Sequence, residues 1–297
     1  MKNTKITITL ALSLLAWGLL AGDGDGGQAG AFLRIPVGER AIGMGDAFTA
    51  IADDAHAFYW NPGGMYQVDK FTLGSSYSLL SLDRHHYTGV IVCPLNQERL
   101  TLMWNKTGVS DIDGRDEEGL PTQTFDDSEM SLGLGYTHAF NASTGLGMML
   151  KYLHHSLEDS KASGIGIDLG FHKRIGSLRL GMSVSNLLSS MEWDIAGSEA
   201  EEIPFTIRGG LACDIRFGKV QLTPTVEFAK TTDETISLHA GAEAGISQYL
   251  KLRAGYSEDK INYGASVIIQ NCSIGYAYSP DFLGEGATSI IGLQLGF

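Results

Sequence analysis

Residues 178–184 read Leu-Arg-Leu-Gly-Met-Ser-Val and decide the fold class, because apolar residues alternate with polar or small ones. In a β-strand, successive side chains point to opposite faces, so this period of two predicts a strand with one apolar face. Residues 163–173 alternate in the same way, with Ile167 and Leu169 on either side of Asp168. One face of each predicted strand is therefore apolar, and the other is small or charged.

The same alternation recurs from residue 71 to the last residue and predicts fourteen strands. They cover residues 71–79, 86–94, 98–107, 129–139, 144–154, 163–173, 177–187, 205–216, 219–229, 235–245, 248–257, 261–269, 271–279 and 288–297.

Short and long connections alternate between these strands. The connections after the even-numbered strands are short, whereas residues 108–128 and 188–204 form long connections after the third and seventh strands. Tight turns at one rim and longer loops at the other are typical of transmembrane antiparallel β-barrels. A soluble sandwich, the alternative fold, gives no reason for this pattern. The 108–128 connection is rich in Asp and Glu, so we expect an acidic outer rim.

The final strand gives an independent indication of a closed barrel. Ile291, Leu293, Leu295 and Phe297 alternate with Gly or Gln. A strand of this kind that ends in Phe resembles the signature by which the barrel-assembly machinery recognises outer-membrane proteins. An exposed apolar edge strand would be prone to aggregation, which favours a barrel that closes on it. We therefore predict an all-β fold, an outer-membrane antiparallel β-barrel of about 14 strands surrounded by lipid.

The composition excludes several classes of protein. The chain has 297 residues, 38 of them Gly, and 21 basic against 34 acidic residues give a net charge of −13. This balance argues against a nucleic-acid partner, because phosphate binding depends on clustered Lys and Arg. The sequence carries no G-x-S-x-G, Walker A or H-E-x-x-H motif and no Cys-x-x-Cys pair. We therefore expect no enzyme activity, no cofactor and no metal site.

The N-terminal residues have the order of a secretory signal peptide. Lys2 and Lys5 precede an uncharged apolar run that ends at Ala21, and a stretch of small residues follows. The run is shorter than the roughly 20 residues of a spanning helix, which disfavours the alternative of a membrane anchor. We expect residues 1–21 to be a signal peptide, residues 22–69 a separate segment and residues 70–297 the barrel.

Charged residues occupy many positions on the face of the strands opposite the apolar one. If the apolar face contacts lipid, these charges line the lumen, where water or opposite charges can compensate them. They are Asp168, Arg179, Arg208, Asp214, Glu227, Glu243, Lys251 and Arg253.

The segment before the first strand lacks alternation and is rich in Ala, Gly, Met and aromatic residues. Residues 32–48 read Phe-Leu-Arg-Ile-Pro-Val-Gly-Glu-Arg-Ala-Ile-Gly-Met-Gly-Asp-Ala-Phe, and residues 59–65 read Tyr-Trp-Asn-Pro-Gly-Gly-Met. These runs resemble the N-terminal segment of the PorV/PorQ family, within the FadL-like group of outer-membrane barrels. The resemblance implies that residues 22–69 form a hatch inside the lumen. It also implies one of two functions, passage of hydrophobic solutes such as long-chain fatty acids or an accessory role in type IX protein secretion that binds cargo C-terminal signals.

Candidate contacts with a hydrophobic ligand lie in this hatch. They are the aromatic residues Phe32, Phe48, Phe58, Tyr59 and Trp60, with the alternative that these side chains pack the hatch in place.

Two further features of the hatch have a structural interpretation. Asn61 and Pro62 begin an Asn-Pro-Gly-Gly turn that reverses the chain before the first strand. Asp53 and Asp54 are placed to anchor the hatch to lumen arginines such as Arg179 or Arg253, or one of them to cap a local turn.

Pro224 lies within the ninth predicted strand, where it supplies no N–H to the ladder. Two interpretations stay open, a local bulge near a rim or a lateral opening in the wall for a hydrophobic ligand.

Overall fold

The computed structural model describes residues 29–81, 84–232, 234–257, 259–280 and 286–297. The predicted signal peptide, residues 1–21, lies outside the described residues. Among the residues that are described, no helix is long and apolar enough to cross a membrane.

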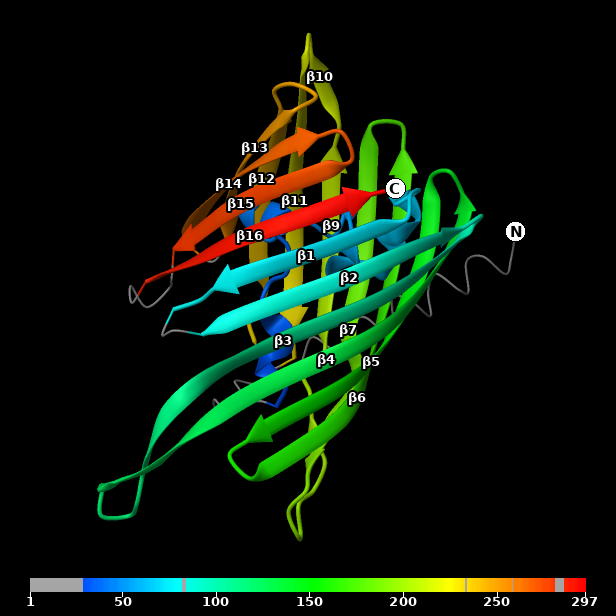
Figure 1. The fold of residues 1–297 in the computed structure, drawn as a ribbon. Helices are drawn as coiled ribbons and strands as arrows, with labels where there is room; N and C mark the ends of the chain where they lie inside the picture. Colours follow the sequence, from blue (N-terminus) through cyan, green and yellow to red (C-terminus); the bar gives the residue numbers. More distant parts are fainter. Residues whose placement is uncertain (1–28, 82–83, 233, 258, 281–285) are drawn as a thin grey trace.

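The described chain consists of a short helical segment followed by strands (Figure 1). The helical elements are η1 (Ala31–Arg34), α2 (Glu39–Gly43), α3 (Ala57–Trp60) and η2 (Pro62–Gln67). The strands are β1 (Thr72–Leu79), β2 (His85–Leu95), β3 (Glu98–Arg115), β4 (Pro121–Asn141), β5 (Thr144–Leu157), β6 (Ser160–Ile175), β7 (Leu178–Trp193), β8 (Glu201–Glu202), β9 (Thr206–Cys213), β10 (Ile215–Phe217), β11 (Val220–Thr231), β12 (Ser237–Gly245), β13 (Leu250–Ser257), β14 (Lys260–Ile269), β15 (Cys272–Pro280) and β16 (Ala287–Gly296).

The strands form one closed antiparallel barrel. The first and last strands pair with each other, with Thr72 of β1 opposite Gly296 of β16. β9 pairs with β7 on one side and β11 on the other, which completes the ring. β9 and β10 are two parts of one wall strand, and β8 is a two-residue extension beside β7, so the wall has the fourteen strands that the alternation predicts.

The side chains of the wall are arranged inside out compared with a water-soluble fold. Arg179 and Asp168 face the interior with 7% and 4% of their surface exposed. The apolar positions between such residues face outward, where Leu293 is 40% exposed and Leu134 is 61% exposed. Hydrocarbon solvates such an apolar outer face. The predicted fold class is therefore confirmed.

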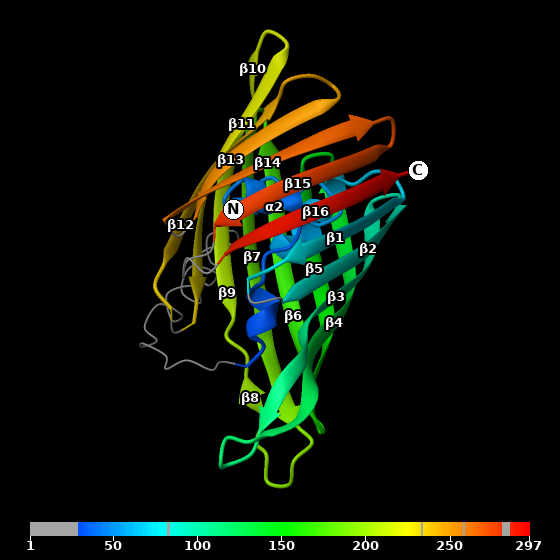
Figure 2. The same ribbon diagram turned by 60° about the vertical axis from the view of Figure 1, so that its left-hand side comes forward.

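The connections between strands are shorter at one end of the barrel than at the other (Figures 1 and 2). Short turns join the strands at the end that holds the β10–β11 turn and the C-terminus, which we call the short-turn end. At the opposite end, the hairpin end, β3 and β4 extend far beyond their neighbours.

The predicted long connections 108–128 and 188–204 are wrong in extent. β3 continues to Arg115 and β4 begins at Pro121, so most of the first connection is a hairpin, and β7 continues to Trp193. Beyond the membrane both faces of a strand are in water, so apolar alternation disappears although the backbone ladder continues. Strands predicted from sequence periodicity are therefore too short at this end.

Pro224 lies in a regular part of its own strand, opposite Ala242 of β12. The irregularity falls in the neighbouring wall strand, which is interrupted between Cys213 of β9 and Ile215 of β10. There the Asp214 backbone N–H donates to the Ser177 carbonyl at 2.8 Å, which continues the ladder with β7 on the other side. Pro224 has no backbone N–H, so β11 offers no donor to the neighbouring strand at this position. The interruption between β9 and β10 lies opposite it.

Candidate functional site

The described hatch, residues 29–70, passes through the lumen from the hairpin end to the short-turn end (Figure 2). Phe32 and Leu33 of η1 pack on Leu153 of β5 and Met191 of β7 near the hairpin end. η2 contacts β4, β5 and β6 before the chain enters β1. The hatch therefore lies in the lumen and contacts the wall from η1 to η2.

Inward-facing glycines let the hatch backbone lie directly on the wall. A Cβ at Gly241 of β12 or Gly255 of β13 would overlap the backbone of Met44. A side chain at Gly147 would meet the Pro62 backbone, and one at Gly181 would meet the Thr49 backbone. One at Gly170 would meet the Asn61 side chain and the Gly63 backbone nitrogen. The high glycine content therefore serves close packing between hatch and barrel.

The Asn-Pro-Gly-Gly turn is pinned to the wall through Asn61. The Asn61 side-chain amide donates to the Thr49 carbonyl and to the Phe171 carbonyl of β6, both at 2.9 Å. Its oxygen accepts from the Gly63 N–H at 3.0 Å, which closes the turn. The Pro62 carbonyl accepts from the Thr137 hydroxyl at 2.8 Å. This geometry agrees with the structural interpretation of the motif.

The candidate aromatic residues are packed between hatch and wall. Phe32, Phe48 and Phe58 are each at most 4% exposed. Trp60 stacks edge-on against Phe48 with 6.4 Å between ring centroids, and its indole N–H donates to the Val37 carbonyl. The Tyr59 hydroxyl donates to the Leu33 carbonyl at 3.2 Å. The geometry agrees with the packing alternative for these side chains.

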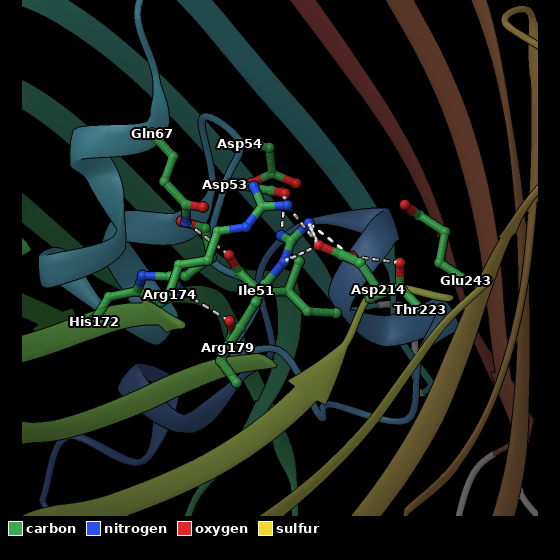
Figure 3. A network of polar contacts seen from close by, with 12 residues as sticks. Ile51, Asp53, Asp54, Gln67, His172, Arg174, Arg179, Asp214, Thr223 and Glu243 are labelled. Atoms are coloured by element: carbon green, nitrogen blue, oxygen red, sulfur yellow. Dashed lines mark hydrogen bonds and ion pairs between the residues drawn. The ribbon is translucent and has the colours of Figure 1, made fainter. Parts of the chain in front are cut away.

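An ionic network joins the hatch to the wall near the short-turn end (Figure 3). Arg179 of β7 donates to Asp53 at 2.7 Å and also binds Asp214 at 2.8 Å. Arg40 of α2 donates to the other oxygen of Asp53. The structure therefore contains the expected contact between Asp53 and a lumen arginine.

A second acidic centre holds α2 from the barrel side. Glu243 of β12 accepts from Arg40 at 2.7 and 2.9 Å, from Arg253 at 2.7 Å and from Lys251 at 3.1 Å. The Glu243 side chain is 7% exposed and the Arg40 side chain 12%. Arg40 thus bridges a hatch carboxylate and a wall carboxylate.

Asp54 takes the other of its two expected roles. One carboxylate oxygen accepts from the His56 backbone N–H at 2.9 Å, which is a local turn contact. The other lies 3.4 Å from Arg40, which belongs to the hatch itself. Asp54 therefore pairs with an arginine of the hatch.

The other predicted lumen charges are paired inside the barrel. Asp168 lies 2.7 Å from Lys151 and accepts from the Asn186 N–H at 2.8 Å. Glu227 accepts from Thr49 of the hatch through both the backbone N–H and the hydroxyl. Arg208 lies 3.4 Å from Glu227, and its guanidinium sits 5.0 Å from the Trp60 ring.

The charge on Asp53 is stabilised by its partners. Burial alone would raise the pKa of this hatch carboxyl, but the Arg40 and Arg179 guanidinium groups lower its pKa to about 2. Asp53 is therefore ionised throughout the physiological range.

Sequence reasoning missed Arg40 and Lys151 as members of these networks. Arg40 stands in a Gly- and Ala-rich run, so its charge was a usable signal. Lys151 occupies an inward position of β5 and could have been found from strand parity alone.

The sequence model of the type IX secretion system membrane protein PorP/SprF family matches residues 122–288, more than half of the chain. The match lies in the barrel and does not include the hatch segment that resembles PorV/PorQ. No curated protein matches the chain.

Solved structures share the architecture at low sequence identity. The toluene transporter TbuX of Ralstonia pickettii is 11% identical, with 88% of this chain and 98% of that chain covered and a TM-score of 0.59. The CymD monoaromatic hydrocarbon channel is 12% identical, with 89% and 98% covered and a TM-score of 0.61. A FadL homologue of Pseudomonas aeruginosa is 12% identical, with 88% and 98% covered and a TM-score of 0.58.

These similarities show a FadL-like outer-membrane barrel fold. Together with the family match, they place the protein in the outer membrane. The chain belongs to the PorP/SprF family of type IX secretion system membrane proteins.

Proposed function

We propose that this protein is an outer-membrane component of type IX secretion that acts through its surfaces. The match of residues 122–288 to the family of secretion membrane proteins carries this proposal. The hatch supports it, because a lumen in which hatch and wall backbones touch leaves no room for a folded cargo protein.

The hairpin end is the region that we propose contacts a secretion partner. β3 and β4 project beyond the barrel, and their tip exposes Leu120 among acidic residues. The PorV/PorQ-like hatch motif supports the finer proposal that the partner is a cargo protein presenting its C-terminal signal. No part of this role requires catalysis.

We also propose the order of maturation that the sequence suggests. Residues 1–21 direct export and are removed, and residues 22–69 fill the barrel formed by residues 70–297. The barrel-assembly machinery recognises the last strand through Phe297, whose side chain is 68% exposed at the short-turn end.

Secretion in the native bacterium tests the main proposal. We expect deletion of the gene to abolish release of type IX cargo, and the wild-type gene to restore it. A variant in which residues 111–125 are replaced by a two-residue turn should still form a barrel, seen as a heat-dependent shift on a gel, yet fail to restore release. The matched control is Phe217→Ala at the short-turn end, which removes an exposed apolar side chain outside the hairpin and should restore release. Normal cargo release in the deletion strain would disprove the proposed function.

A second candidate function, passage of hydrophobic solutes, is favoured by one observation on the outer wall. A hollow of about 640 Å³ opens toward the lipid between β7 and β12. Its lining is apolar and includes Leu211 of β9 and Val226 and Phe228 of β11, the strand that also contains Pro224.

Uptake of a labelled long-chain fatty acid tests this second candidate. Uptake above that of cells lacking the protein supports passage, and its reduction by Pro224→Val supports an opening in the wall at this strand. Uptake equal to that of the deletion strain rejects passage, and uptake unchanged by Pro224→Val rejects the wall opening.

A further inference from the structure

Two cavities with many polar lining groups lie beside α2, one toward the hairpin end and one toward the short-turn end. The cavity on the hairpin side has a volume of about 260 Å³ and is lined by Ser257, Ser279 and Thr288. The cavity on the short-turn side has a volume of about 330 Å³ and is lined by Arg253 and Gln294. Both cavities therefore border strands β13 to β16 from opposite ends of the barrel, and the hairpin-side cavity also borders β9, β11 and β12.

The helix α2 separates the two cavities. Ile42 borders the cavity on the hairpin side, whereas Glu39 and Arg40 border the cavity on the short-turn side. Ile42 packs with Ala277 of β15 and Ile290 of β16 in a small apolar cluster. This cluster is the apolar seal between two polar spaces.

Small wall residues bring α2 close to the barrel. The Glu39 side chain lies across Gly275 and Gly292, and a Cβ on Gly43 would lie 3.0 Å from the Gly264 Cα. The five-residue helix α2 therefore lies directly on these strands.

A glycine with positive φ lies on each side of α2. Gly38 precedes the helix with a φ of 86°, and Gly45 follows it with a φ of 65°, conformations that glycine adopts without strain. The Arg40 side chain binds Asp53, Asp54 and Glu243 and lies over the Phe48 ring. Arg40 thus fastens a helix that lies between two glycines with positive φ.

We propose that the barrel also conducts small polar solutes and ions along the β13–β16 wall, with α2 as the gate and Arg40 as its latch. The solute is polar because hydroxyl, amide and charged groups border both cavities. Movement of Ile42 away from Ala277 and Ile290 would join the cavities into one path. This activity is independent of the role in secretion, which we assign to the hairpin end.

Potassium chloride currents through the purified protein in planar bilayers test the gate. We expect the wild-type protein to open rarely and Arg40→Gln to raise the open probability roughly tenfold or more, because Glu243 and Asp53 then no longer hold α2. The matched control is Arg174→Gln, which removes an arginine that binds Asp214 but does not contact α2. Its open probability should equal that of the wild type.

A disulfide across the seal keeps the proposal testable if Arg40→Gln fails to fold. Ile42→Cys with Ala277→Cys, in a protein whose three native cysteines are replaced by serine, ties α2 to β15 when oxidised. Oxidation should abolish the openings and reduction should restore them. The proposal is overturned if currents persist after oxidation, or if folded Arg40→Gln and Arg174→Gln proteins conduct alike.

Discussion

Arg179 of the wall and Asp53 of the hatch form an ion pair of 2.7 Å across 126 residues of sequence. The Arg179 side chain is 8% exposed and the Asp53 side chain 22%, so the pair is largely withdrawn from water. The same guanidinium binds Asp214, which keeps Arg179 in place whether or not the hatch is seated. Asp214 therefore positions the Arg179 guanidinium of the wall to bind the Asp53 carboxylate of the hatch.

Replacement of Asp53 by Asn should destabilise the protein strongly. The change keeps the shape of the side chain but leaves the charges of Arg40 and Arg179 less well compensated, so we expect the free energy of unfolding to fall by about 3 kcal/mol. Urea titration of the barrel refolded in lipid vesicles measures this value. The control is Glu234→Gln, which breaks the exposed pair with Arg34 and should cost less than about 1 kcal/mol. Equal losses in the two variants would contradict a special role for Asp53.

The contribution of Asp53 should persist in mild acid. Its pKa is about 2 in the folded protein, below the value of about 3.9 for a free Asp side chain. A lowered pKa gives stability that is fully present above the unfolded value and is lost as the pH falls through the folded value. The difference in unfolding free energy between wild type and Asp53→Asn should therefore be constant from pH 7 to about pH 5. A difference that already vanishes at pH 5 would show that the carboxylate is not held in this way.

Two glycines of β12 should respond differently to the same substitution. A methyl group at Gly241 would overlap the Met44 carbonyl, whereas one at Gly245 finds its nearest neighbour, the Gln221 carbonyl, at 3.6 Å. We expect Gly241→Ala to cost about 1–3 kcal/mol from overpacking and Gly245→Ala to be nearly neutral. Thermal unfolding of both variants in the same detergent makes the comparison. Similar melting temperatures would mean that the hatch does not rest on the wall as described.

A matched pair of leucines should reveal the position of the membrane. Leu134 of β4 and Leu120 of the β3–β4 turn are both 61% exposed. Leu134 faces outward in the part of the wall with apolar neighbours, so Leu134→Arg should cost about 2–4 kcal/mol in vesicles. Leu120→Arg should change stability by less than about 0.5 kcal/mol, because the turn is in water. Equal effects would place both residues in the same solvent.

The parts of the fold that follow from local alternation were predictable. The inward position of Asp168, the outward position of Leu293 and the fourteen wall strands all depend on strand parity, which sequence spacing records directly. The ends of β3 and β4 were not predictable, because a hairpin in water on both faces has no apolar side to mark its length.

The partners of the charged side chains in the lumen could be identified only from the structure. Parity indicates that Arg179 and Glu243 face inward, but their partners depend on the stagger of the strands and the path of the hatch. The role of Gly241 could not be predicted for the same reason. Composition gives the number of glycines, but it does not show which of them lies against the backbone of the hatch.

The contacts of the hatch with the seam strands have a consequence for assembly. The Ala55 N–H donates to Gln294 of β16 at 2.9 Å, and Glu39 lies against Gly292 of the same strand. β16 is the strand that joins β1 to complete the ring. The hatch therefore contacts the strand that completes the ring, and we expect that a hatch peptide supplied to a preassembled empty barrel will fail to enter it.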